Sequence, residues 1–515
     1  MKVVNAGQMR DIERRYREGG GSLDDLMERA GREVASGVRR LLNGAVGQSI
    51  IVLVGPGNNG ADGLVAARHL RKWGADVRAF VLAPRPADDP KLRLAVQAGV
   101  EVVGPTDALP RLEGALSPAS LVLDAVLGIG KARPLEGTAR QALTLTAQAR
   151  RRRPDLKIVA LDLPSGLDAD TGAADPATLP CDVTITLGYP KPGLLSFPGA
   201  GLVGRLDVAD IGLPEGLASD ITTELITPEL VRTLLPTRPR DANKGTFGKT
   251  LVVAGSINYI GAAYLACAAA GRIGAGLLTL ATPQSLLPIL ASKLTETTFL
   301  PLPEAAPGVL GPEADSAIQQ RLSDYNALLV GPGLGQHPAT AQLVSSLLLS
   351  PSLVPPVVLD ADALNTLAGT PEGWKQLKVR AVLTPHPGEM SRLTGIPVAR
   401  IQEDRLAVAG KAAQEWGQVV VLKGAFTVVA VPSGQAWISP WANPALASAG
   451  TGDVLAGAIV GLLAQGLGPE QATIAAVYLH GLAGEMAAQA IGEVGVVASD
   501  LLPLLPKARR QVKST

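Results

Sequence analysis

Cysteine and aromatic residues are scarce in this chain of 515 residues, which contains two cysteines and 3% Phe, Trp and Tyr. Cys181 and Cys267 lie far apart in the sequence, each in apolar surroundings. We therefore expect two reduced, buried thiols, and neither a disulfide nor a cysteine metal site. With so few aromatic rings, the cores must be aliphatic and closely packed.

The chain also lacks an excess of positive or negative charge, because it contains 47 basic and 46 acidic residues. This balance argues against a nucleic-acid partner and an anionic membrane surface, and it favours small-molecule partners. No run of about 18 uninterrupted apolar residues occurs. The start, MKVVNAGQMRDIERR, lacks the apolar core of a secretion signal. We expect a cytoplasmic protein with no membrane attachment.

The succession of patterns predicts two α/β domains. Behind Ser22, apolar residues recur at intervals of three and four, which is typical of a capped amphipathic helix. Short apolar runs then alternate with helix-length segments, which indicates parallel βαβ units. These runs lie at 50–54, 77–82, 121–124, 157–162 and 183–187, and in a second series at 250–256, 276–283, 327–335, 356–365, 381–389 and 418–432. We place the boundary near residue 220, which gives domains 1–220 and 221–515.

Polar groups follow three of the predicted strands in the first half. The loop GPGNNGADG leads into a helix, an arrangement that presents backbone N–H groups to a phosphate. Asp124 ends a second strand, and Asp162 and Ser165 follow a third. Because parallel strands end at one edge of the sheet, these oxygens would surround a cation and a substrate. Turn glycines and salt-bridged loop carboxylates are the structural alternative.

The motifs GPGNNGADG, DAVLGIGKARP and DLPSGLDADTG, behind LMERAG, resemble the YjeF N-terminal domain, the NAD(P)H-hydrate epimerase family. The resemblance implies a Rossmann-like three-layer α/β/α domain that interconverts the R and S forms of a nicotinamide ring hydrated at C6. It implies potassium ligands at Asn59, Asp124 and Ser165. It also implies substrate contacts at Asn58, Asn59, Gly60, Ala61, Asp62, Gly128, Ile129, Gly130, Lys131, Ala132, Arg133, Pro134 and Asp162.

Asp162 is our first candidate for the epimerase base. Removing the proton of the C6 hydroxyl would allow the ring to open and reclose, and a carboxylate in the nucleotide cleft suits this task. Asp124 is the rival, although a carboxylate bound to potassium is a poorer base.

A single acid in the second half, Asp453, stands in NPALASAGTGDVLAG at the start of an apolar helix pattern. Asp is a good helix cap, which is one interpretation. The other is a base that takes a proton from a substrate hydroxyl, beside a helix N-terminus that receives phosphate. Upstream, LTPHPGE holds His386 between two prolines, as a structural or a ligand residue. Asp360 and Asp362 either act on magnesium through water or cap the helix that follows them.

The ordered motifs KGTFGKTLVVAGS, GAAYLA, GPGLG, DADALN, LTPHPGE, LKG and NPALASAGTGD resemble the YjeF C-terminal family, the ADP- or ATP-dependent NAD(P)H-hydrate dehydratases of ribokinase-like fold. The lead-in ASAGTGD departs from the more glycine-rich family pattern, which affects only fine positioning. The resemblance implies hydrate contacts at Ala262, Gly333, His386 and Asp453. It implies adenine-nucleotide contacts at Lys423, Gly424, Ala425, Phe426, Thr427 and Gly452.

Together the resemblances imply an enzyme with two activities, in which the first domain interconverts the hydrate epimers and the second dehydrates the S form. The expected phosphate donor is ADP with Mg²⁺, giving AMP and phosphate, and Asp453 is the expected base. A homo-oligomer, up to an octamer, is also implied. Two alternatives stay open: a ribokinase-like vitamin-precursor kinase with an accessory nucleotide-binding domain, and a first domain that serves only for binding or assembly.

Overall fold

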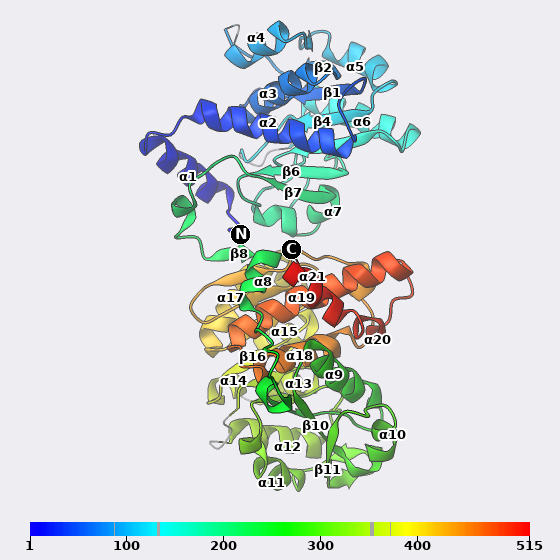
Figure 1. The fold of residues 1–515 in the computed structure, drawn as a ribbon. Coiled ribbons are helices and arrows are strands. Elements are labelled where there is room, and N and C mark those ends of the chain that lie inside the picture. Colours follow the sequence, from blue (N-terminus) through cyan, green and yellow to red (C-terminus); the bar gives the residue numbers. More distant parts are fainter. Residues whose placement is uncertain (87, 131–133, 351–354, 371, 515) are drawn as a thin grey trace. The chain divides into compact units, whose positions relative to one another are not determined.

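The computed structural model describes residues 1–86, 88–130, 134–350, 355–370 and 372–514. The chain forms two compact units, Met1–Ile221 and Thr222–Thr515. Figure 1 shows the two units coloured along the sequence. Three of the predicted substrate contacts, Lys131, Ala132 and Arg133, lie outside the described residues.

A seven-stranded parallel sheet forms the centre of the first unit, in the order β3-β2-β1-β4-β5-β6-β7. Its strands are β1 (Ser49–Val54), β2 (Asp76–Val81), β3 (Glu101–Val103), β4 (Leu121–Ala125), β5 (Lys157–Leu161), β6 (Val183–Leu187) and β7 (Arg205–Ala209). The strand order reverses between β1 and β4. Sheets of this kind bind ligands beyond the carboxyl ends of the strands at that point.

Helices cover both faces of this sheet. Alternate residues of β1 point to opposite faces: Ile50 and Val52 pack with α2 and α3, whereas Ile51 and Leu53 pack with α5 and α6. The Ser22 hydroxyl caps α2 by accepting from the Asp25 N–H at 3.1 Å, as the sequence predicts. The helices of this unit are α1 (Ala6–Glu18), α2 (Leu23–Leu41), α3 (Asn58–Lys72), α4 (Pro90–Gln97), α5 (Ala108–Leu116), α6 (Gly137–Arg152) and α7 (Ala200–Val203).

A ten-stranded sheet forms the centre of the second unit, in the order β11-β10-β9-β14-β15-β16-β17-β18-β19-β8. Its strands are β8 (Thr223–Leu225), β9 (Lys249–Val253), β10 (Leu277–Pro283), β11 (Thr298–Leu302), β14 (Ala327–Val330), β15 (Val357–Leu359), β16 (Ala381–Leu383), β17 (Val419–Leu422), β18 (Val428–Ala430) and β19 (Ala436–Ile438). The strands from β11 to β17 run parallel, and β17, β18 and β19 pair antiparallel. β8 pairs in parallel with β19 at one end of the sheet. A separate antiparallel pair joins β12 (Glu304–Ala306) and β13 (Val309–Leu310).

Two helical layers enclose this sheet as well. On one face pack α9 (Ile260–Ile273), α18 (Thr451–Ala464), α19 (Pro469–Ile491) and α21 (Leu505–Ser514). On the other pack α11 (Ala314–Gln319), α12 (Pro338–Leu349), α13 (Asp362–Gly369), α15 (Pro387–Thr394) and α17 (Arg405–Trp416). Shorter helices are α8 (Pro228–Leu234), α10 (Leu287–Ala291), α14 (Gly373–Gln376), α16 (Val398–Glu403) and α20 (Ala498–Leu501). The predicted three-layer α/β/α class is confirmed.

Both cysteines are free, as expected. Cys267 is buried in the core of the second unit, but Cys181 is only partly buried, because it lies in the segment that enters β6 and not within the strand. Among the helices that the structure describes, none is long and apolar enough to cross a membrane.

Candidate functional site

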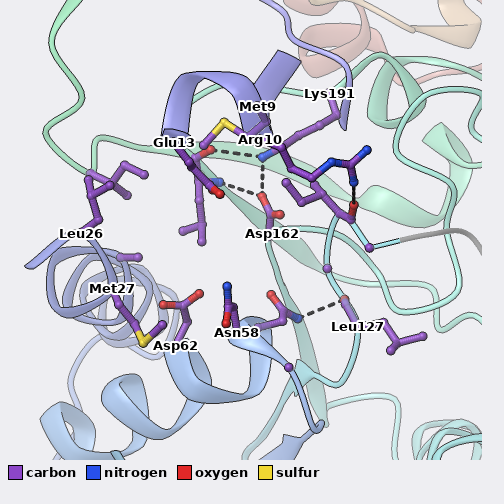
Figure 2. Close-up of a pocket in the computed structure, with 18 of the residues that line it drawn as sticks. Met9, Arg10, Glu13, Leu26, Met27, Asn58, Asp62, Leu127, Asp162 and Lys191 are labelled. Carbon is purple, nitrogen blue, oxygen red and sulfur yellow. Dashed lines mark hydrogen bonds and ion pairs between the residues drawn. The ribbon is translucent and has the colours of Figure 1, made fainter. Parts of the chain in front are cut away.

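A cavity of about 560 Å³ opens in the first unit, where the strands β1, β4, β5 and β6 end. Figure 2 shows its polar side chains converging from α1, α3 and the strand ends. Of the predicted residues, it is lined by Asn58, Asn59, Asp62, Gly128, Ile129, Gly130 and Asp162. Residues without an earlier prediction include Met9, Arg10 and Glu13 of α1, and Lys191. Pro134 instead lines a smaller cavity of about 300 Å³, which shares Pro56, Val126 and Leu127 with the first.

The glycine loop after β1 packs directly against the end of β4. A side chain at Gly55 would place its Cβ 1.8 Å from the Val126 carbonyl oxygen, and one at Gly60 would meet the Gly55 oxygen at 2.1 Å. Only glycine fits this close approach. The loop opens α3, whose N-terminus has no side-chain cap, so its first N–H groups are placed for an anionic ligand.

Asp162 and Lys191 form a buried ion pair in the cavity (Figure 2). The Lys191 side chain is fully buried, and its ammonium donates to Asp162 Oδ1 at 2.5 Å, to Thr186 Oγ1 at 3.0 Å and to the Leu187 carbonyl at 3.1 Å. Asp162 Oδ1 also accepts from the Leu187 N–H at 3.0 Å. Among the described residues, the hydrogen bonds of this carboxylate all involve Oδ1, which fixes its orientation. The motif YPKPG holds Lys191 between two prolines after β6, a signal that could have identified it.

Two further carboxyl groups line the same cavity. Burial, and then the negative charges of Asp162 and Glu13, raise the pKa of Asp62 well above its ordinary value. Burial, and then the charge of Asp162, raise the pKa of Glu13. The cavity therefore holds two acids whose protonated forms are favoured, beside the ion pair of Asp162 and Lys191.

The three predicted potassium ligands surround the backbone of Leu127. Asn59 Nδ2 donates to the Leu127 carbonyl at 3.0 Å, and the Leu127 N–H donates to Ser165 Oγ at 2.9 Å. Ser165 Oγ in turn donates to Asp124 Oδ1 at 2.6 Å, and its N–H donates to Oδ2 at 2.9 Å. Asp124 is fully buried, and burial raises its pKa. It lies behind the cavity wall and not among the lining residues, a poor place for the rival base.

Asp453 lies in the first turn of α18, but its side chain does not cap the helix. The N-cap is Gly450, whose φ of 90° lies in the left-handed region, and no side-chain cap bond is present. The helix-cap interpretation is therefore wrong, because Asp453 sits inside the helix and past the cap position. Burial, and then the charge of Asp360, raise the pKa of Asp453 to about 7.

Lys423 lies beside the N-terminus of α18. Its ammonium is 2.6 Å from Asp360 Oδ1 and 3.7 Å from Glu389 Oε2, and a Cβ at Gly452 would be 3.4 Å from it. Burial raises the pKa of Glu389 to about 7. Glu389 ends the motif LTPHPGE and was given no role from the sequence. A cation and several acids therefore gather at the ends of β15, β16 and β17.

The other predicted residues of this unit come from segments that follow β9, β14, β15 and β17. Asp362 begins α13 and accepts from the Gly335 N–H at 2.8 Å. A Cβ at Gly333 would be 2.8 Å from that of Ala262, so these two residues are neighbours. Gly424, Ala425, Phe426 and Thr427 form the turn between β17 and β18, which begins beside Lys423.

His386 caps α15 with its ring. Nδ1 accepts from the Gly388 N–H at 3.0 Å and the Glu389 N–H at 3.3 Å. Burial and the charge of Lys423 lower the pKa of His386, which favours the neutral ring. Its half-exposed side chain keeps Nε2 for a second partner, 3.4 Å from Glu389 Oε1. The structural role is thus present, and it leaves room for a ligand role.

Comparisons with known proteins agree with the two units. The family model described as NAD(P)H-hydrate dehydratase matches residues 250–507, and the YjeF-related protein N-terminus model matches residues 23–193. A ribokinase-like superfamily protein of Enterococcus faecalis is 25% identical in sequence with a TM-score of 0.50, covering 57% of this chain and 98% of its own. This likeness confirms the ribokinase-like fold of the second unit.

Two curated relatives span nearly the whole chain. The bifunctional NAD(P)H-hydrate repair enzyme Nnr of Moorella thermoacetica is 43% identical over 95% of this chain and 92% of its own length. The protein of the same name from Thermofilum pendens is 38% identical over 100% of this chain and 97% of its own. The chain therefore belongs to the family of bifunctional NAD(P)H-hydrate repair enzymes.

Proposed function

We propose that residues 1–220 epimerise the R and S hydrates of NADH and NADPH, and that residues 221–515 dehydrate the S hydrate with ADP, giving AMP and phosphate. The observation that carries the proposal is the Asp453 carboxylate, which is partly buried in the first turn of α18 and near the Lys423 ammonium. This combination suits a base that works next to a phosphate. A cytoplasmic homo-oligomer, expected from the sequence, is part of the proposal.

Epimerisation begins with transfer of the C6 hydroxyl proton to Asp162. Its Oδ1 is held by Lys191 and Leu187, so the carboxylate is oriented before the substrate arrives. Asn58, Asn59 and the residues 60–62 bind the nucleotide at the start of α3, and Gly128, Ile129 and Gly130 line the cavity after β4. Lys131, Ala132, Arg133 and Pro134 remain predicted substrate contacts. Reclosure of the opened ring on its other face gives the second epimer.

A potassium ion is proposed at Asn59, Asp124 and Ser165. Asp124 supports this assignment, because it is a fully buried carboxylate whose described partners are hydroxyl and N–H groups and not a cation. Carboxylate, hydroxyl and amide oxygens are the donors that hard cations prefer. The bound ion would neutralise the buried charge and hold the β4 loop against the substrate.

Dehydration follows from making the C6 oxygen a leaving group. Asp453 takes the C6 hydroxyl proton while this oxygen attacks the terminal phosphorus of ADP and AMP departs. The N-terminus of α18, with Gly452, and Lys423 stabilise the phosphoryl charge. The C6–O bond then breaks, phosphate leaves and C5 loses a proton, which restores the C5–C6 double bond. Ala262, Gly333 and His386 hold the hydrate, and residues 424–427 hold the nucleotide.

Magnesium bound with ADP would neutralise charge on the transferring phosphoryl group. Asp360 is paired with Lys423, whereas Asp362 bonds to the Gly335 N–H and to Asn365. Asp362 is therefore the better placed of the two predicted acids to reach the ion through water.

Hydrated NADH supplied with ADP is expected to regain its absorbance near 340 nm, because the dihydronicotinamide ring is restored. With a mixture of epimers, recovery should be complete, since the first unit replenishes the S form. The control omits ADP. Absence of recovery, together with stable phosphorylation of a pyrimidine or thiazole alcohol, would establish the vitamin-kinase alternative instead.

The dehydration rate is expected to fall as the pH drops below about 7. The direction follows because Asp453 acts as a base and must be deprotonated, while its pKa is raised to about 7. With purified S hydrate, kcat near pH 6 should be about one tenth of its alkaline plateau. Glu389→Gln should move this fall to lower pH, because Glu389 raises the pKa of Asp453. A rate independent of pH between 6 and 8 would contradict the assignment.

A further inference from the structure

Within the described part of the chain, Asp62 has no partner for one of its carboxyl oxygens, although it is more than nine-tenths buried. Its side chain lines the epimerase cavity, and the residue is 8% exposed. Among the described residues, its Oδ1 makes no hydrogen bond. An unsatisfied buried carboxyl oxygen costs free energy, so a partner from outside the chain is expected. Figure 2 shows Asp62 on α3 and Asp162 beyond β5 reaching toward the same space.

We propose that Asp62 is a second catalytic residue of the epimerase site, the acid that protonates the ring nitrogen while Asp162 takes the hydroxyl proton. This inference rests on the proposed epimerase function. It gives Asp62 a chemical task beyond the substrate contact that the sequence resemblance implies.

The surroundings of Asp162 and Asp62 differ, as is required if one carboxyl group acts as a base and the other as an acid. Asp162 is paired with the Lys191 ammonium. The charged groups acting on Asp62 are Asp162 and Glu13, which favour its protonated form, and Lys91 of α4, which opposes them. Arg10 donates to the Ile129 carbonyl on the other side of the cavity, and α2 contributes Met27 and Ala30, which are apolar. Two carboxyl groups in unequal surroundings become a base and an acid.

The proposed steps balance in atoms and electrons. Asp162 accepts the proton of the C6 hydroxyl, the C6–N1 bond breaks, and its electron pair moves to N1, which receives the proton of Asp62. The products are a C6 aldehyde and a secondary enamine nitrogen. After rotation about the C5–C6 bond, N1 attacks the other face of the aldehyde. Asp62 regains its proton from N1, and Asp162 returns a proton to the C6 oxygen. No oxidant or reductant is required.

The test replaces Asp62 with asparagine, which keeps the size of the side chain but carries no transferable acid proton. We expect kcat for conversion of R hydrate to S hydrate to fall at least about 100-fold while KM changes little. In the unsubstituted protein, the rate should also fall at high pH as Asp62 loses its proton, and Asp62→Asn should remove this alkaline fall. Asp62→Glu keeps an acidic proton and should restore part of the alkaline fall.

Two controls separate a chemical role from a structural one. Asp76→Asn makes the same change at an exposed position of β2 and should leave kcat and the pH profile unchanged. Glu13→Gln removes a charge that raises the pKa of Asp62, so the alkaline fall should begin at lower pH. If Asp62→Asn retained kcat within about twofold with its alkaline fall intact, the inference would be overturned.

Failure of the proposed function would look different. If the unsubstituted protein left R hydrate unchanged, the epimerase assignment itself would be wrong. If that protein converted R hydrate, and Asp162→Asn abolished conversion while Asp62→Asn did not, only the role of Asp62 would be wrong. Thermal unfolding of each variant checks that the first unit is folded.

Discussion

Asparagine in place of Asp453 is expected to lower ADP-dependent dehydration of S hydrate by about 10²–10⁴-fold, the usual contribution of a positioned general base. The amide has nearly the shape of the carboxylate but cannot accept the hydroxyl proton. Because no hydrogen bond of the described residues holds the Asp453 side chain, the change removes chemistry and little structure. The measurement is the rate of absorbance recovery near 340 nm with purified S hydrate and saturating ADP.

The same variant should leave epimerisation at its original rate, since Asp453 belongs to the other unit. Glu493→Gln is a matched control, because it neutralises an exposed carboxylate of the second unit. Dehydration by Asp453→Asn at more than about a tenth of the original rate would mean that another group removes the proton. Glu389 would then be the next residue to test.

Asparagine in place of Asp162 should abolish epimerisation and also destabilise the first unit. The activity is lost because the proposed base is gone. Stability falls because Lys191 is fully buried and its ammonium loses its carboxylate partner. Breaking one partner of a buried pair costs about 3–5 kcal/mol. Chromatographic assay of R and S hydrates measures the first effect, and denaturant unfolding of the first unit measures the second.

A double variant separates the two effects. Adding Lys191→Met to Asp162→Asn removes the unpaired ammonium and should recover most of the lost stability, while epimerisation stays absent. Asp107→Asn, at an exposed position before α5, should change neither quantity. Full epimerisation by a stable double variant would exclude Asp162 as the base.

Much of the strand arrangement was predictable, because buried parallel strands appear as short apolar runs. The predicted runs at 50–54 and 183–187 correspond to β1 and β6 within one residue. The run at 418–432 is divided into β17 and β18 by a turn at Gly424, whose φ is 140°. Strand ends also indicated which polar groups meet, as Asp124 and Ser165 do.

The side chains that complete each site were less accessible from sequence. Glu13 and Asp162 are separated by nearly 150 positions, and Glu13 lies on an amphipathic helix with many other charges. Charge spacing within α1 does not reveal which acid faces the cavity. Lys191 stands in the proline-flanked loop YPKPG and Glu389 in the motif LTPHPGE, but a lysine or glutamate in such a loop is more often exposed. Only the fold shows that both are buried.

The short strand β8 determines where a separately expressed second unit should begin. β8 belongs to the second unit and pairs along β19, although it precedes by more than 20 residues the segment that the dehydratase family model matches. A protein begun at that matched segment would leave β19 with a row of unpaired backbone groups, a template for pairing between copies. Independent expression of the dehydratase therefore requires a start before Thr223, so that β8 stays paired with β19 and covers the edge of the sheet.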